Sequence, residues 1–253
     1  AKVLAGGQSL LPFMKLRLAF PTALVDIGRI AELSYVREDG DVLAIGALTT
    51  HDELHRNEVV SEHAPLLAHA AGEIGDPQVR HLGTIGGSVA HGDPASDLPS
   101  ALLALEAECV VRGAGGERRV PASEFFTGTF ETALGPQELL TEIRVPRHTG
   151  TGWSYVKFHP RAQDWAIVGV AAVVERSNGG IGKARVALTN MGPTPMRATA
   201  VEQALESGAD PAAAADAATE GTNPVTDPFG TAEYRMELAK ILTRRALEEA
   251  LAR

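Results

Sequence analysis

Two glycine pairs organise this chain: residues 5–9, Ala5-Gly6-Gly7-Gln8-Ser9, and residues 84–88, Thr84-Ile85-Gly86-Gly87-Ser88. A double glycine lets the backbone approach a ligand closely and adopt positive φ. Adjacent N–H groups in such a loop can converge on an anion, and flanking hydroxyls add donors. One pair alone is more simply a tight turn. Two pairs flanked by small hydroxyl residues support a pyrophosphate clamp and a pair of turns equally.

Short strands and helices alternate around these loops. Hydrophobic periodicity and turn residues predict strands over 2–5, 24–27, 33–37, 42–46 and 108–112, the third and fourth joined as a hairpin. Helices are expected from Ser9, from Thr50, over 64–71 and over 98–106. Thr50 and Glu53 have the spacing of a capping box, and Asp97 is expected to cap the last of these helices.

The pattern changes at residues 148–152, His148-Thr149-Gly150-Thr151-Gly152, which predicts a boundary between domains 1–148 and 149–253. Strands over 153–158, 166–176 and 181–189 favour an antiparallel meander, with a turn at 177–180. The remainder is rich in alanine and predicts helices over 198–205, 211–219 and 234–251. In the last helix, Leu238, Ile241 and Leu242 are expected to form the buried stripe.

Composition excludes several classes of protein. The 253 residues are 44% hydrophobic and 22% charged, which is typical of a globular chain with a core. The net charge of −9 disfavours nucleic acid or an anionic membrane as the main partner. A single cysteine, Cys109, excludes an internal disulfide and an iron–sulfur cluster, which needs about four thiolates. Any iron–sulfur chemistry must therefore be carried by another chain.

Familiar nucleotide and metal motifs are absent or incomplete. No G-x-G-x-x-G or P-loop sequence occurs. His51 and His55 are one helical turn apart, but the zinc protease pattern needs Glu where Asp52 stands, so we expect a surface helix. Asp93 and Asp97 have metal-ligand chemistry, although a cap also explains Asp97. Trp165 precedes an apolar strand and is either a cover for a flat ring or a packed aromatic.

One ordered set of motifs resembles a known family. It comprises AGGQSLLP at 5–12, MKLR at 14–17, TIGGS at 84–88, GDP at 92–94 with Asp97, and YVKFHPRAQDWAIVGVAA at 155–172. Together these are similar to the FAD-binding medium subunit of the molybdenum hydroxylases (the xanthine dehydrogenase and carbon monoxide dehydrogenase family). The resemblance implies an α+β fold: a two-part FAD domain of the vanillyl-alcohol-oxidase (PCMH) type, then a small antiparallel three-stranded sheet with helices. It also implies that an N-terminal strand–helix unit is missing from this chain.

The same resemblance assigns site residues. Both glycine loops would grip the FAD pyrophosphate, through Ala5, Gly6, Gly7, Gln8, Ser9, Thr84, Ile85, Gly86, Gly87 and Ser88. Ile74 would contact FAD through its backbone, and Asp97 would bond cofactor hydroxyls. Trp165 would lie beside the isoalloxazine, with Lys157 and Leu82 near the ring. No catalytic acid or base and no metal ligand is expected in this chain.

The resemblance also implies a route for electrons. Substrate would be oxidised at the molybdenum cofactor of a large subunit, and electrons would cross [2Fe–2S] clusters of a small subunit to this FAD. A quinone, NAD or oxygen would accept them. A dimer of heterotrimers, in the cytoplasm or peripheral to a membrane, is implied. The substrate stays open among carbon monoxide, aldehydes, N-heterocycles and purines. Two alternatives remain: a stand-alone flavin reductase or oxidase of the same fold, and a non-redox nucleotide- or anion-binding module.

Overall fold

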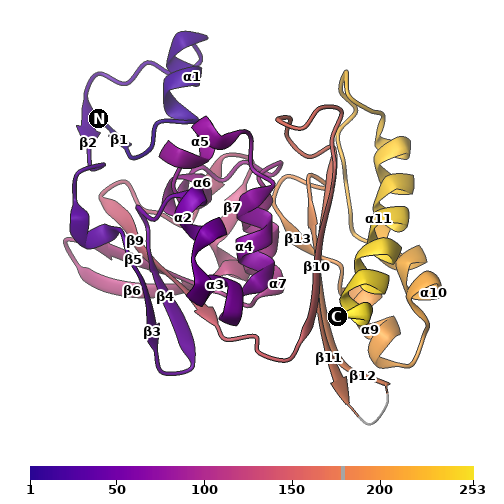
Figure 1. Ribbon diagram of the computed structural model, residues 1–253. Coiled ribbons are helices and arrows are strands. Elements are labelled where there is room, and N and C mark those ends of the chain that lie inside the picture. The colour runs from indigo at the N-terminus through magenta and orange to yellow at the C-terminus, as the bar shows by residue number, and fades with distance from the viewer. Residues whose placement is uncertain (178–179) are drawn as a thin grey trace.

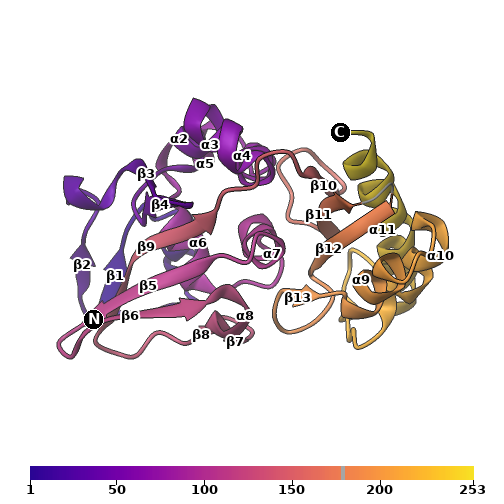
Figure 2. The same cartoon turned by 90° about the horizontal axis from the view of Figure 1, so that it is seen from below.

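The computed structural model describes residues 1–177 and 180–253 and has a layered arrangement (Figure 1). A five-stranded sheet lies on one side, a layer of helices comes next, and a second sheet with its own outer helices completes the stack. Figure 2 shows the same order from below, with α7 between the two sheets. The chain is therefore an α+β protein, as the family resemblance implied.

The first sheet is antiparallel throughout, in the order β3-β4-β9-β5-β6. Its strands are β3 (Val36–Asp39), β4 (Val42–Gly46), β5 (Glu108–Gly113), β6 (Gly116–Pro121) and β9 (Glu138–Pro146). The predicted hairpin joins β3 to β4, with Gly40 at φ +62° in its turn. The first strand begins three residues later than expected, because η1 (Ala31–Leu33) is a 3₁₀ turn.

The first glycine loop follows a strand of a small separate sheet. Strand β1 (Lys2–Leu4) pairs in parallel with β2 (Leu24–Asp26), and helix α1 (Leu10–Lys15) lies on the connection between them. Both strands were predicted, each ending one residue later than observed. The parallel pairing requires this crossover connection. The loop at residues 5–9 begins the crossover and lies at the carboxyl end of β1.

Between β4 and β5 the chain forms the helices α2 (His51–Arg56), α3 (Glu58–His63), α4 (Pro65–Gly72), α5 (Pro77–Leu82), α6 (Ile85–His91) and α7 (Asp97–Ala104). All of these except α5 contribute buried side chains to the core that packs on the five-stranded sheet. The predicted capping box at Thr50 and Glu53 is confirmed, with both reciprocal bonds present. The expectation of a surface helix at 51–55 is wrong for His51, which is 4% exposed and packs against Gly83.

The role predicted for Asp97 as a helix cap is also wrong. Ser96 occupies the N-cap of α7, and Asp97 is the first helical residue. Its carboxylate is turned into the protein, where it bonds two side chains of the second sheet. Beyond α7, the chain adds α8 (Ala122–Phe125), β7 (Phe126–Gly128) and β8 (Glu131–Thr132) at the edge of the first sheet.

The second sheet has four antiparallel strands, not the three expected. Its order is β10 (Gly152–Phe158), β11 (Val168–Ser177), β12 (Gly180–Thr189) and β13 (Met196–Arg197). The extra strand, β13, pairs only two residues with β12, and Pro195 directly precedes it. So short a pairing leaves no periodic pattern to detect. The turn predicted at 177–180 includes residues 178–179, which lie outside the described residues.

Helices cover the outer face of this sheet: α9 (Thr199–Glu206), α10 (Pro211–Ala215), the 3₁₀ turn η2 (Asp216–Thr219) and α11 (Ala232–Ala252). Helix α11 packs on β10 and β11 (Figure 1). Leu238 and Leu242 are buried as predicted, whereas Ile241 is 48% exposed. The stripe follows the i, i+4 row through Ala246 and Ala250, which turns Ile241 to solvent.

Strand β11 is buried on both faces and joins two cores. Val168, Val170, Ala172 and Val174 face the outer helices. Ala171 and Val173 face the central helices and share one core with α4 and α7. The second sheet is therefore packed directly on α7, which carries the predicted cofactor residue Asp97. In the part of the chain that is described, no helix is long and apolar enough to cross a membrane.

Candidate functional site

The two glycine loops lie against each other. A Cβ atom on Gly6 would stand 1.8 Å from the carbonyl oxygen of Leu82 and 2.7 Å from its carbonyl carbon. A Cβ on Gly87 would be 3.9 Å from that of Ala5. Only glycine at position 6 allows the first loop to approach the backbone that leads into the second.

The first loop presents free backbone donors. Gly7 has φ +73°, a conformation that favours glycine. Among the described residues, the N–H groups of Gly6, Gly7, Gln8 and Ser9 find no acceptor. Ser9 occupies the N-cap of α1, yet its hydroxyl makes no capping bond. Consecutive free amides with an uncommitted hydroxyl are the donor set that a phosphate oxygen requires.

The second loop uses its amides to hold its own position. Ile85 N–H donates to Thr49 O at 3.0 Å, and Gly86 N–H to Ala47 O at 2.9 Å. Gly87 N–H donates to Thr84 Oγ1 at 3.1 Å, and Ser88 N–H to Thr84 O at 3.0 Å. The donors expected on both loops are thus concentrated on the first. The second forms a fixed wall, on which the Thr84 N–H and the Ser88 hydroxyl find no partner within the described chain.

Aromatic packing ties the two loops together. Phe13 of α1 meets His91 of α6 edge-on with ring centroids 5.4 Å apart, and Phe130 contacts both rings. Burial lowers the pKa of His91, which favours the neutral ring in this cluster. These contacts fix α1, and with it the first loop, against α6. The sequence analysis missed them because the three rings are far apart in the chain.

Two of the residues predicted to contact FAD, Ile74 and Trp165, belong to segments that border a second region, whereas Leu82 lies against Gly6 of the first loop. A hollow of about 390 Å³ lies between the α4–α5 turn and the β10–β11 connection, lined by Gly72, Glu73, Gly75, Asp76, Pro77, Arg80, His159, Ala162 and Gln163. Ile74 belongs to the same turn, and its carbonyl accepts a bond from Arg80 Nη1 at 3.0 Å. Trp165 belongs to the same connection and is 56% exposed. Leu82, 54% exposed, ends helix α5.

Asp97 and Lys157 meet in a buried network. Lys157 Nζ donates to Asp97 Oδ2 at 3.0 Å and to the carbonyl of Glu73 at 2.9 Å. The Tyr155 hydroxyl donates to Asp97 Oδ1 at 2.6 Å. Burial raises the pKa of Asp97, and the Lys157 ammonium and the Tyr155 hydroxyl oppose that rise. Tyr155 was missed by the sequence analysis, although its place two residues before Lys157 puts both on one strand face.

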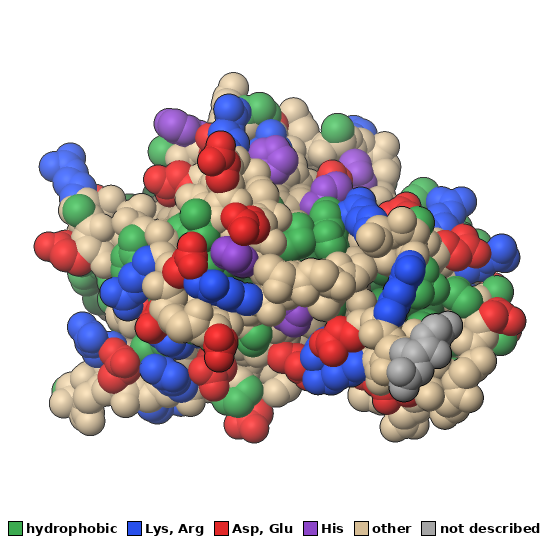
Figure 3. All heavy atoms as spheres, turned by 60° about the horizontal axis from the view of Figure 1, so that its bottom comes forward, with side chains coloured by type: hydrophobic (Ala, Val, Ile, Leu, Met, Phe, Trp, Pro, Cys, Tyr) green, Lys and Arg blue, Asp and Glu red, His purple; other side chains and the backbone are tan. Residues whose placement is uncertain are grey.

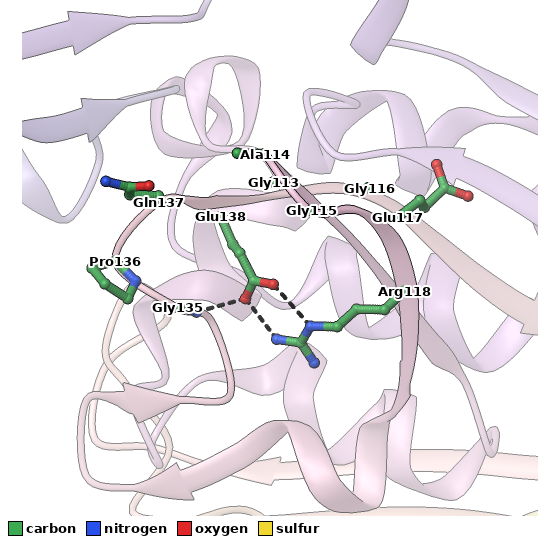
Figure 4. A pocket seen from close by; sticks show the side chains of 10 residues that line it. All are labelled: Gly113, Ala114, Gly115, Gly116, Glu117, Arg118, Gly135, Pro136, Gln137 and Glu138. Carbon is green, nitrogen blue, oxygen red and sulfur yellow. Dashed lines mark hydrogen bonds and ion pairs between the residues drawn. The ribbon is translucent and has the colours of Figure 1, made fainter.

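Other polar candidates stay apart from this site. The Asp93 carboxylate accepts the Ala95 amide at 2.9 Å. Within the described chain, no three His, Cys, Asp or Glu side chains are grouped as metal ligands. A hollow of about 540 Å³ opens between the β5–β6 turn and Gly135–Glu138 (Figure 4). Its main charges satisfy each other, because Glu138 pairs with Arg118 at 2.6 Å and accepts the Gly135 amide.

Two protein families match the chain in succession. Residues 1–148 match the FAD binding domain in molybdopterin dehydrogenase, and residues 153–250 match the CO dehydrogenase flavoprotein C-terminal domain. The chain belongs to the FAD-binding subunits of the molybdopterin dehydrogenases. It is thus a subunit of an oxidoreductase, and membership in this family overturns the alternative of a non-redox anion-binding module.

Relatives with names support the same assignment. The carbon monoxide dehydrogenase medium chain of Hydrogenophaga pseudoflava is 46% identical over all of this chain and 90% of its own length. The 6-hydroxypseudooxynicotine dehydrogenase complex subunit alpha of Paenarthrobacter nicotinovorans is 39% identical, covering 100% of this chain and 88% of that relative.

Solved structures agree with the sequence relatives. Carbon monoxide dehydrogenase from H. pseudoflava superposes with a TM-score of 0.96 at 47% identity, over 99% of this chain and 89% of that one. Quinoline 2-oxidoreductase from Pseudomonas putida 86 superposes with a TM-score of 0.93 at 31% identity, over 99% of this chain and 90% of that one. This molybdopterin dehydrogenase subunit is the FAD-carrying member of a multi-subunit enzyme, similar to the carbon monoxide dehydrogenase medium chain.

Proposed function

We propose that the subunit holds the FAD pyrophosphate on its first glycine loop and relays electrons from the [2Fe–2S] clusters of a small partner subunit to an external acceptor. The observation that carries this proposal is the run of amides from Gly6 to Ser9 that have no acceptor among the described residues and that pack against the backbone at Leu82. Bound FAD supplies the redox chemistry, and the protein orients and tunes it. The second loop, Thr84–Ser88, would limit the space on the other side of the pyrophosphate.

The ring would lie at the hollow beside Ile74. That turn is held by Arg80 through the Ile74 carbonyl and by Lys157 through the Glu73 carbonyl. Trp165 has an exposed ring on the facing connection, where it can cover a flat aromatic ligand. Leu82 would contribute apolar surface between the ring and the glycine loops.

Asp97 and Lys157 fit the polyhydroxyl part of the cofactor. Each Asp97 oxygen accepts one bond from the protein and keeps another lone pair for a hydroxyl donor. Lys157 has three donor hydrogens and uses two. The pair is 4% and 2% exposed, so a hydroxyl bound there would be shielded from water.

The clusters and the molybdenum cofactor would belong to partner chains. Cys109 is the single cysteine, and burial raises its pKa to about 12, which keeps the thiol protonated. We therefore expect a small iron–sulfur subunit and a large molybdenum subunit that sets the substrate, assembled as a dimer of heterotrimers. On the face shown in Figure 3, acidic and basic side chains alternate, which favours specific protein contacts over a broad polyanion site. A quinone, NAD or oxygen would take the electrons.

Isolation of the native complex tests the electron route. We expect about one FAD for each copy of this chain, together with iron and molybdenum on co-purifying larger and smaller chains. Reduction by substrate should bleach the iron–sulfur and flavin bands together. An intact complex without flavin would refute FAD binding, and FAD without iron would refute the route through clusters.

Trp165 gives a separate test of where the ring binds. Adding FAD to the flavin-free full chain should quench tryptophan fluorescence, because an exposed Trp165 ring would stack on or beside the isoalloxazine. Trp165→Phe should remove most of that quench. Trp153→Phe is the matched control, since Trp153 lies under the Arg253 guanidinium, 3.6 Å from the ring centroid, and beside His69. An unchanged quench in Trp165→Phe would place the ring elsewhere.

A further inference from the structure

Tyr155 is a buried phenol directed at a predicted cofactor residue. It is 4% exposed and donates to Asp97 Oδ1 at 2.6 Å. Burial and the Asp97 charge hold the pKa of this phenol well above its usual value, so it stays protonated and remains a donor.

Residues of three neighbouring strands leave space for this hydroxyl. Lys157, Gly169 and Thr189 stand in register across β10, β11 and β12. A Cβ on Gly169 would lie 2.9 Å from the Tyr155 hydroxyl oxygen and 3.0 Å from Thr189 Oγ1. The glycine thus leaves the space that the phenol and the threonine hydroxyl occupy.

A second layer of hydroxyls connects the phenol to helix α7. Thr189 and Ser100 are both fully buried, and their hydroxyls are hydrogen-bonded to each other. Ser100 Oγ also donates to the Asp97 carbonyl at 3.1 Å. The phenol therefore sits among hydroxyls from β12 and α7, which restrict where its oxygen can move.

These contacts hold Asp97 from two directions. The phenol fixes Oδ1 and the Lys157 ammonium fixes Oδ2, so the plane of the carboxylate is determined. Without the phenol, Oδ1 would be a buried acceptor with no donor from the protein, which is unfavourable. The carboxylate could then rotate, and its remaining lone pairs would lose their direction.

We propose that Tyr155 is a positioning residue for the flavin site: it orients the Asp97 carboxylate so that this group and Lys157 present their free bonding positions to the cofactor hydroxyls. The inference rests on the proposed function, because it takes Asp97 as a cofactor contact. On this proposal the second sheet contributes to the flavin site through β10, which carries both Tyr155 and Lys157.

The test compares two tyrosines that make the same bond. In the full chain, Tyr155→Phe should raise the dissociation constant for FAD roughly tenfold, the effect of one hydrogen bond to a charged group. Tyr35→Phe is the matched control, because the Tyr35 hydroxyl donates to Glu142 Oε2 at 2.6 Å on the first sheet. The Tyr35→Phe variant should bind FAD with the same affinity as the unmodified chain.

A double-mutant cycle separates positioning from general packing. If Tyr155 acts through Asp97, adding Tyr155→Phe to Asp97→Asn should weaken FAD binding less than twofold further. Full additivity would overturn the proposal. Should Tyr155→Phe fail to fold, the isosteric Thr189→Val removes the supporting hydroxyl and should weaken binding about threefold, with no change overturning the proposal.

The outcomes also separate this inference from the function it rests on. An unmodified chain that does not bind FAD would refute the proposed function. An unmodified chain that binds FAD, with Tyr155→Phe binding equally well, would refute only the positioning role.

Discussion

Gly6→Ala should remove most of the FAD from this subunit. The added Cβ would lie 1.8 Å from the Leu82 carbonyl oxygen and 2.7 Å from its carbon, so backbone must move to admit it. The first loop would then shift by about an ångström, and a misplacement of that size can reduce function by about a hundredfold. We expect FAD to bind roughly a hundredfold more weakly, measured by titration of the full chain and by flavin content after purification.

Gly115→Ala is the control for this substitution. Gly115 also belongs to a glycine pair, but a Cβ there would meet nothing within 4 Å. Stability should therefore change by about 0.5 kcal/mol or less, and flavin content should not change. Normal FAD affinity in Gly6→Ala would show that the contact with Leu82 does not determine the site.

The two glycine loops mark how far the sequence can predict this site. Close approach and positive φ are local properties of glycine, so Gly6 and Gly7 could be identified without a structure. Which loop keeps free amides could not, because the partners of Ile85 and Gly86 are the carbonyls of Thr49 and Ala47. Those bonds depend on how α6 packs against the start of α2, which only the tertiary fold determines.

Asp97 shows that a local sequence signal can also predict the wrong role for a residue. An aspartate before an apolar run is a sound local signal for a cap. The structure gives the cap position to Ser96 and directs Asp97 to Tyr155 and Lys157, about sixty residues later. Several strands and helices were predictable from their periodicity, but the sequence analysis did not predict β6 or the long central strand β9, and β13 has two residues and little pattern of its own.

Lys157→Met should destabilise the fold strongly. The Lys157 ammonium and the Asp97 carboxylate are 2% and 4% exposed and 3.0 Å apart. Removing the ammonium leaves a buried charge without its partner, which lowers the free energy of unfolding by about 3–5 kcal/mol. Lys183→Met is the control, since its ion pair with Glu106 is 45% and 42% exposed and should contribute about 1 kcal/mol or less. Urea unfolding of both variants measures the difference.

The pH dependence of that loss identifies its cause. Burial already raises the pKa of Asp97, and without Lys157 the rise becomes larger. The native state of the variant then binds a proton at a pH where the unfolded chain does not, so its stability should recover as pH falls through the native pKa. Adding Asp97→Asn removes the charge and should restore most of the stability at neutral pH. If the double variant stays as unstable as Lys157→Met, the loss comes from the packing of the lysine stem between α4 and α7, and the ion pair is not what stabilises this junction.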